Sequence, residues 1–192
     1  MLYAVQHATA DFVEAPAPRV AVQWFMQAAD GERRGEVEGD EPTRTAGHYP
    51  APLFYIERCA RVATHSPDPN KQVGCVIANA QGEIVCEACN DIPDGLAKHD
   101  ARCTRPLKYK WIEHAERNAI YAAARRGIPL QGATIYVNWW PCVDCCRAIL
   151  QSGITNVVSP QRPDSGHPRW GEDFKMTFQM LDEAGINYCF LA

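Results

Sequence analysis

The feature that most constrains this 192-residue chain is a pair of short motifs, each placed where a predicted helix begins. The first motif is His114-Ala-Glu116, and the second is Pro141-Cys142-Val-Asp-Cys145. Cys142 and Cys145 are three residues apart, so both lie on one face of a first helical turn. There, unpaired N–H groups and the positive end of the helix dipole stabilise thiolates. Together the two motifs have the composition of a metal site.

The spacing within the motifs indicates a catalytic rather than a structural metal. His114 and Glu116 are two residues apart, about 200° around a regular helix, so one of them ligates the metal and the other does chemistry. His114, Cys142 and Cys145 would then supply three ligands, which leaves the fourth tetrahedral position of Zn²⁺ open for water. We therefore expect zinc as the cofactor.

Strand and helix patterns alternate from residue 51 onward, which predicts an α/β domain. Helices are expected at 53–64, 114–126, 142–152 and 172–184, from apolar spacing or from a glycine at the end. Strands are expected at 73–78, 83–88, 134–138, 156–159 and 186–191, the first two flanking a turn of hairpin length. This order predicts a three-layer α/β/α fold in which helices cover both faces of a mixed five-stranded sheet.

Residues 1–50 differ in composition from the rest of the chain. Glu14-Ala-Pro-Ala-Pro-Arg19 is a stiff connector, and residues 30–45 are charged and nearly free of apolar side chains. Residues 20–28 fit a strand or a short helix equally well. We expect an N-terminal arm over 1–50, packed on its own domain or on a neighbouring subunit, and a catalytic domain over 51–192.

Composition and charge limit the location and the partners. No apolar run approaches the roughly 18 residues of a membrane span, and the first basic residue is Arg19, so the charged start of a signal peptide is missing. We expect a cytoplasmic protein that does not enter a membrane. The formal charge of −4, from 19 Lys and Arg against 23 Asp and Glu, disfavours nucleic acid and favours a small-molecule substrate.

A His-x-Glu motif followed by Pro-Cys-x-x-Cys is the signature of zinc nucleobase deaminases. Over about residues 53–159, the chain resembles the cytidine and deoxycytidylate deaminase superfamily, and within it the deoxycytidylate (dCMP) deaminases most. The matching segments are His114-Ala-Glu-Arg-Asn-Ala-Ile120, Gly132-Ala-Thr-Ile-Tyr-Val137, Pro141-Cys-Val-Asp-Cys145 and Ala148-Ile-Leu-Gln-Ser-Gly-Ile154. Asp68-Pro-Asn-Lys-Gln-Val-Gly74 and Asn90-Asp-Ile-Pro-Asp-Gly95 match less closely.

The resemblance implies a cytidine-deaminase-like fold and the hydrolysis of dCMP to dUMP with release of ammonia. It implies that zinc on His114, Cys142 and Cys145 lowers the pKa of bound water. Glu116 would accept the proton of this water as the hydroxide attacks C4 of cytosine. Because dCMP deaminases assemble into dimers or hexamers, the resemblance also implies a homo-oligomer.

Three residues near the motifs are candidates for contacts with the base and the sugar. Asn90 matches the superfamily asparagine that contacts the sugar, but asparagine is also a common turn former. Trp139 and Trp140 precede the second motif, where the superfamily has its pocket wall. One could stack on the base while the other is buried behind it, or both could be core aromatics.

Positive charge before the first motif offers a candidate phosphate site. Lys108, with Arg105 and Lys110, could hold a 5′-phosphate. A solvated basic face explains the same three residues equally well.

A second set of potential metal ligands has the spacing Cys86-x2-Cys89-x9-His99-x3-Cys103. This spacing suits a closed zinc site, and many dCMP deaminases carry a second structural zinc near this loop. Cys86 and Cys89 lie at the end of a predicted strand, where residues three apart face opposite sides unless the strand breaks. Both readings stay open.

One loop departs from the family pattern. Regulated dCMP deaminases carry Gly-Tyr-Asn-Gly where this chain has Ala88-Cys89-Asn90-Asp91, in a loop tied to activation by dCTP with Mg²⁺. The change removes a stacking ring and a flexible glycine, and it adds a carboxylate that repels a triphosphate. We therefore expect no activation by dCTP.

The sequence leaves two alternatives to dCMP deamination. The first is a deaminase of another substrate, such as a modified cytosine nucleotide, a free base, a nucleoside or a polynucleotide. The second is a zinc-stabilised binding module, which would need a fourth protein ligand and no use for Glu116.

Overall fold

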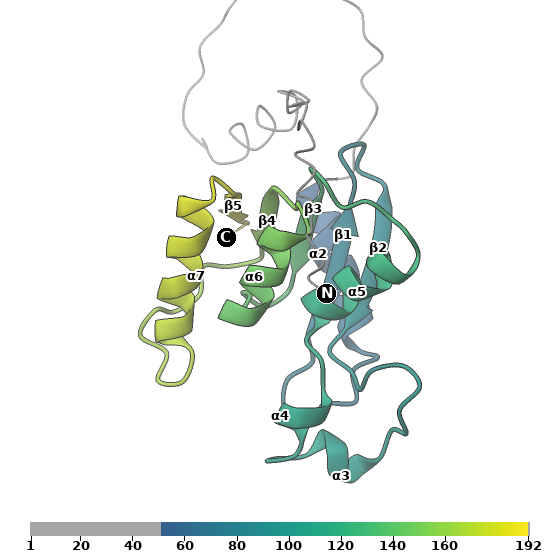
Figure 1. Ribbon diagram of the computed structural model, residues 1–192. Helices are drawn as coiled ribbons and strands as arrows, with labels where there is room; N and C mark the ends of the chain where they lie inside the picture. The colour runs from purple at the N-terminus through teal and green to yellow at the C-terminus, as the bar shows by residue number, and fades with distance from the viewer. Residues whose placement is uncertain (1–50, 192) are drawn as a thin grey trace, which may run out of the picture. The chain divides into compact units, whose positions relative to one another are not determined.

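The computed structural model describes residues 51–191, which form a five-stranded sheet with helices (Figure 1). The strand order is β2-β1-β3-β4-β5. The strands are β1 (Gly74–Ala78), β2 (Ile84–Cys89), β3 (Thr134–Val137), β4 (Asn156–Ser159) and β5 (Asn187–Phe190). β1 pairs antiparallel with β2 and β3, whereas β3, β4 and β5 run parallel. The mixed five-stranded sheet is confirmed, and the arm expected over 1–50 lies outside the described residues.

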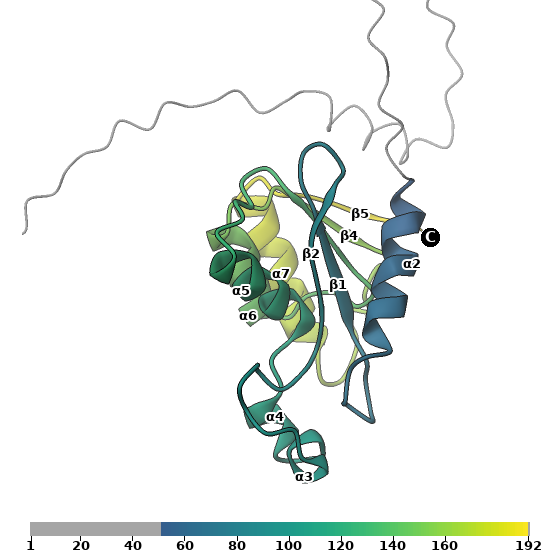
Figure 2. The same cartoon turned by 90° about the vertical axis from the view of Figure 1, so that its right-hand side faces the viewer.

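Helices cover the two faces of the sheet unequally (Figure 2). Helix α2 (Pro52–Ala63) lies on one face, and α5 (Ala115–Arg125), α6 (Val143–Gln151) and α7 (Gly171–Glu183) lie on the other. Every residue of β1 is buried, as a strand covered on both faces requires. A Cβ on Gly74 would lie 2.0 Å from the Cys59 carbonyl oxygen, so only glycine lets α2 approach β1 this closely. The three-layer α/β/α fold is confirmed.

The elements expected from the sequence are present, with ends that differ by one or two residues. Helices α5 and α6 each begin one residue later than expected, because His114 and Cys142 have extended backbone conformations and are the N-cap residues of these helices. The two helices pack against each other on the same face of the sheet. Their N-termini therefore present the two motifs to one place.

The segment between β2 and α5 contains two short helices that the sequence does not predict. They are α3 (Asp100–Cys103) and α4 (Lys108–Trp111). Four residues make barely one helical turn, so neither can produce a periodic apolar pattern. Within 51–191, no helix combines the length and the apolar character that crossing a membrane would require.

Candidate active site

The two motifs meet at the N-termini of α5 and α6. His114 Nδ1 lies 3.4 Å from the Sγ atoms of both Cys142 and Cys145, and the three ligand atoms all lie within 4.8 Å of one another. Zinc bonds of ordinary length in a tetrahedral site would separate N and S by about 3.6 Å. Both the donor set and its spacing therefore fit zinc.

The electrostatics of the two cysteines suit a metal that binds thiolates. Hydrogen bonds from the Cys145 thiol and from His114 lower the pKa of the Cys142 thiol to about 4. The same Cys145–Cys142 contact, followed by burial, raises the pKa of Cys145. Cys142 is thus the sulfur at which the site favours a thiolate. Arg117 contributes a positive charge that opposes the rise at Cys145.

Glu116 lies in the first turn of α5, and its side chain is only 3% exposed. Burial raises the pKa of this carboxyl, and the nearby His114 opposes the rise. Glu116 lines the same cavity as His114 and Cys142, so it faces any molecule that reaches these two ligands. Glu116 is not part of the three-residue ligand cluster, so it is free for a role other than metal binding, as its two-residue spacing from His114 predicts.

His114, Cys142 and Glu116 line a cavity of about 730 Å³, whereas Cys145 is fully buried. This volume is in the range of sites for small molecules. The wall is built from the loop before β1, the end of β2, α4, the starts of α5 and α6, and the start of α7. Among the described residues, the only group of three or more potential metal ligands is His114, Cys142 and Cys145. A structural module with a fourth protein ligand therefore finds no support here.

A family model described as the cytidine and deoxycytidylate deaminase zinc-binding region matches residues 52–160. The chain belongs to this deaminase family. The match confirms both the resemblance and zinc as the cofactor.

Relatives and solved structures agree with this membership. The deaminase is 49% identical over 142 residues to the deoxycytidylate deaminase of Enterobacteria phage T4, covering 74% of this chain and 69% of that protein. It is 32% identical over 113 residues to the human deoxycytidylate deaminase, covering 56% of this chain and 62% of the human protein. The crystal structure of dCMP deaminase from the cyanophage S-TIM5 in apo form shares the fold, with a TM-score of 0.57 at 22% identity over 71% of this chain and 94% of that one. The cytidine-deaminase-like fold is thus confirmed.

Asn90 lines the cavity and also ties the loop before β1 to the end of β2. Its Oδ1 accepts the N–H of Val73 (2.8 Å), and its Nδ2 donates to the Lys71 carbonyl (3.0 Å). One lone pair and one N–H of the amide remain for other partners. Asn90 therefore holds the wall in place and retains polar atoms that a sugar could contact.

The two tryptophans have separate environments. Trp140 is 3% exposed, donates from Nε1 to the Thr177 hydroxyl (2.8 Å), and stacks on Phe178 of α7. Its ring thus packs mainly in the core, and because the residue also lines the cavity, its assignment as a substrate contact stays a prediction. Trp139 is half-buried and lines the cavity, with the Lys71 ammonium 3.5 Å from the centre of its ring.

Alanine substitutions of the two tryptophans should have different effects on stability and on KM. Trp140→Ala should lower the free energy of unfolding by about 3–5 kcal/mol, because it leaves a large cavity against α7. Trp139→Ala should cost less stability and raise KM for dCMP by about tenfold, since a stacking surface is lost. Chemical denaturation and steady-state kinetics on both variants check this. A Trp139→Ala protein that is destabilised as strongly, with unchanged KM, would contradict the assignment.

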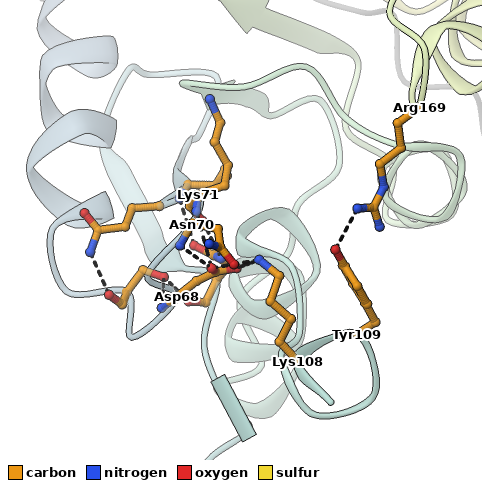
Figure 3. Close-up of polar contacts among 10 residues, drawn as sticks. Asp68, Asn70, Lys71, Lys108, Tyr109 and Arg169 are labelled. Carbon is orange, nitrogen blue, oxygen red and sulfur yellow. Dashed lines mark hydrogen bonds and ion pairs between the residues drawn. The ribbon is translucent and has the colours of Figure 1, made fainter. Parts of the chain in front are cut away.

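Lys108 reaches the cavity wall but is already paired. Its Nζ donates to both carboxylate oxygens of Asp68, at 2.8 and 2.6 Å, and the two side chains are only 7% and 6% exposed (Figure 3). Asp68 also accepts the N–H of Asn70 (2.8 Å), which fixes the loop before β1. The charge of Lys108 is therefore balanced by Asp68, and the phosphate role expected for this lysine stays a prediction. Arg105 lines the cavity, whereas Lys110 is exposed and lies outside its lining.

Removing one member of this buried ion pair should be costly. Lys108→Met should lower the free energy of unfolding by about 3–5 kcal/mol, because Asp68 is left charged and buried without a partner. The double variant Lys108→Met with Asp68→Asn should regain most of that loss. Lys110→Met, two residues away and exposed, serves as the control. If denaturant unfolding gives Lys108→Met and Lys110→Met the same free energy of unfolding, a structural role for the ion pair is contradicted.

The second set of potential ligands does not come together. Strand β2 continues through Cys89, so Cys86 and Cys89 face opposite sides of the sheet. Cys86 is buried in the core that includes Ala119 and Ala123 of α5, and the neighbouring Glu87 pairs with Arg58 of α2 on the other face. Cys86, Cys89, His99 and Cys103 form no cluster among residues 51–191. The spacing in sequence therefore does not bring these four residues together, because side chains alternate between the two faces along β2.

Several cavity residues escape prediction from the sequence. Arg117 directly follows the first motif, donates from Nε to Glu113 just before α5 (2.6 Å), and also pairs with Asp144 of α6. Lys71 lies in the weaker family segment, which could have drawn attention to it. Arg169 lies beyond the matched region, and no local pattern marks it.

Proposed function

We propose that this chain is a zinc-dependent deoxycytidylate deaminase, which hydrolyses dCMP to dUMP and ammonia. The observation that carries the proposal is a three-ligand site of His114, Cys142 and Cys145 beside a buried glutamate in an open cavity. The 49% identity to the phage T4 deoxycytidylate deaminase supports the choice of substrate. The alignment covers part of that protein, so the substrate is a proposal for this chain.

Each residue of the site has a separate role in the proposed reaction. When bound to His114, Cys142 and Cys145, zinc supplies a Lewis acid that lowers the pKa of water toward neutrality. Glu116 accepts a proton from the attacking water as the C4–O bond forms and delivers it to N3. It then takes the second proton from the new C4 hydroxyl and delivers it to the amino group, which leaves as ammonia while the C4 carbonyl forms. Trp139 provides an aromatic wall for the base, and Asn90 offers polar atoms to the sugar. Burial of Glu116 excludes bulk water from the proton transfer.

A substrate panel tests the proposal. The zinc-loaded full chain is incubated with dCMP, CMP, deoxycytidine, cytosine, a 5-substituted dCMP, an adenine nucleotide and a cytosine-containing oligonucleotide, and ammonia release is measured. We expect the highest kcat/KM with a deoxycytidine monophosphate. Preference for the oligonucleotide, or for the free base or nucleoside, would overturn the substrate assignment while leaving the deaminase family intact.

We further propose that the enzyme acts as a homo-oligomer in the cytoplasm. Support comes from the family resemblance and from the charged stretch at residues 30–45, which is nearly free of apolar side chains and cannot build a core of its own.

The loop at Asp91 predicts simple kinetics. The Asp91 carboxylate accepts the N–H of Ile92 (2.7 Å) and pairs with Lys98, so it is held at the end of β2. The side chain of Asp91 is therefore already engaged, and Cys89 supplies no ring where the family pattern has a tyrosine, so this loop lacks a stacking surface for an effector base. We expect a hyperbolic dependence of rate on dCMP that dCTP with Mg²⁺ does not change. A sigmoidal curve that dCTP makes hyperbolic would show that this loop still serves as an effector site.

A further inference from the structure

Two segments far apart in the sequence meet at the cavity, and one of them lies outside the region matched by the family model. Arg169 precedes α7, beyond residue 160, and its Nη1 donates to the Tyr109 hydroxyl of α4 at 2.6 Å (Figure 3). The guanidinium carbon also lies 4.5 Å from the centre of the Tyr109 ring and 4.9 Å from that of Trp170. Both Arg169 and Tyr109 line the cavity.

The backbone around Arg169 is held in place. The His167 ring nitrogen Nδ1 accepts the N–H groups of Arg169 (3.2 Å) and Trp170 (3.1 Å). Gly171 packs against the Ser165 carbonyl so closely that a Cβ would lie 2.4 Å from its oxygen. The guanidinium is thus presented from a fixed loop, and most of its five N–H donors remain after the bond to Tyr109.

The charge balance of the cavity leaves Arg169 available to an anion. Lys108 is neutralised by Asp68, and Arg117 by Glu113. Within the described part of the chain, no ion pair engages the remaining cations of the lining, which are Lys71, Arg105 and Arg169. Asp173 and Glu116 are the lining carboxylates that likewise form no ion pair. Free positive charge exceeds free negative charge, as a site for a dianion requires.

We propose that Arg169, positioned by Tyr109, binds the 5′-phosphate of the substrate and makes this site prefer a nucleotide to a nucleoside. The inference rests on the proposed deaminase function and adds a specificity residue to it. Arginine suits this task because its planar fork can donate two parallel hydrogen bonds to phosphate oxygens. Tyr109 takes one donor and orients the others, so it is a positioning residue.

The test compares dCMP with deoxycytidine, which differ only in the phosphate. Arg169→Gln in the zinc-loaded full chain should lower kcat/KM for dCMP by about 10- to 100-fold, mainly through KM, because a charge-assisted hydrogen bond is lost. With deoxycytidine it should stay within about twofold of the unmodified chain. Arg169→Lys should recover part of the loss, and Tyr109→Phe should raise KM for dCMP by about fivefold. Arg162→Gln, in the same loop but outside the cavity lining, is the matched control and should leave kcat/KM unchanged with both dCMP and deoxycytidine.

Equilibrium binding of the product dUMP and of deoxyuridine, measured by calorimetry, gives a readout independent of turnover. Arg169→Gln should weaken dUMP binding and leave deoxyuridine binding unchanged. Equal effects on both ligands, or no effect on dUMP, would overturn the role of Arg169. If the unmodified chain binds dUMP through Arg169 but does not deaminate dCMP, the proposed function fails while the phosphate assignment stands.

Discussion

Replacing Glu116 by glutamine should lower kcat for dCMP by about 10³-fold while the zinc content stays at one ion per chain. The amide keeps the shape of the buried side chain but cannot accept and deliver the protons of the reaction. Because Glu116 faces the cavity and is not among the three clustered ligands, its loss should leave the metal in place. Steady-state kinetics with metal analysis of the same preparation check both halves of this expectation.

Glu57→Gln is the matched control for that experiment, since Glu57 is exposed on α2, on the opposite face of the sheet. It should retain normal kcat and zinc. A Glu116→Gln protein that deaminates at a near-normal rate would contradict the assignment of proton transfer to this residue.

Replacing Cys145 by serine should remove zinc and activity together. Cys145 is fully buried within the three-ligand cluster, and a hydroxyl at this position is a much weaker zinc ligand than a thiolate. We expect the zinc content to fall from one ion per chain to near zero and the rate with dCMP to fall by at least about 10³-fold. Metal analysis after gel filtration, followed by the rate assay, measures both.

Cys146 provides a control one residue away. Its side chain is also buried, but it points away from the cluster and contacts the Thr177 carbonyl of α7. Cys146→Ala should retain zinc and activity at some cost in thermal stability. If Cys145→Ser kept its zinc and its rate, or if Cys146→Ala lost both, the ligand assignment would be wrong.

The fold follows from sequence wherever a pattern extends over several turns or a whole strand. Apolar spacing in 53–64 and the glycines after 126, 152 and 184 are local signals, and the helices they predict are present within one or two residues. The helices α3 and α4 produce no such signal because each has only four residues. Their positions depend on packing rather than on propensity.

In the site, too, the local features could be predicted from the sequence and the contacts between distant segments could not. The metal ligands can be predicted because each motif is local and its helix start is marked, so only the meeting of α5 and α6 had to be inferred. The role of Lys108 could not be predicted, because its partner Asp68 is 40 residues away and nothing in either segment indicates the pair. Trp139 and Trp140 are adjacent in sequence, and only the placement of α7 decides which of them is covered.

Stepwise return of zinc to the metal-free chain tests the central claim most directly. The chain is stripped with a chelator, zinc is added in substoichiometric steps, and the conversion of dCMP to dUMP is followed by the loss of cytosine absorbance. If one zinc held by His114, Cys142 and Cys145 serves the reaction, the rate should rise linearly from near zero and stop rising at one zinc per chain. Full activity without zinc, or a rise that ends only at two zinc ions per chain, would contradict the account.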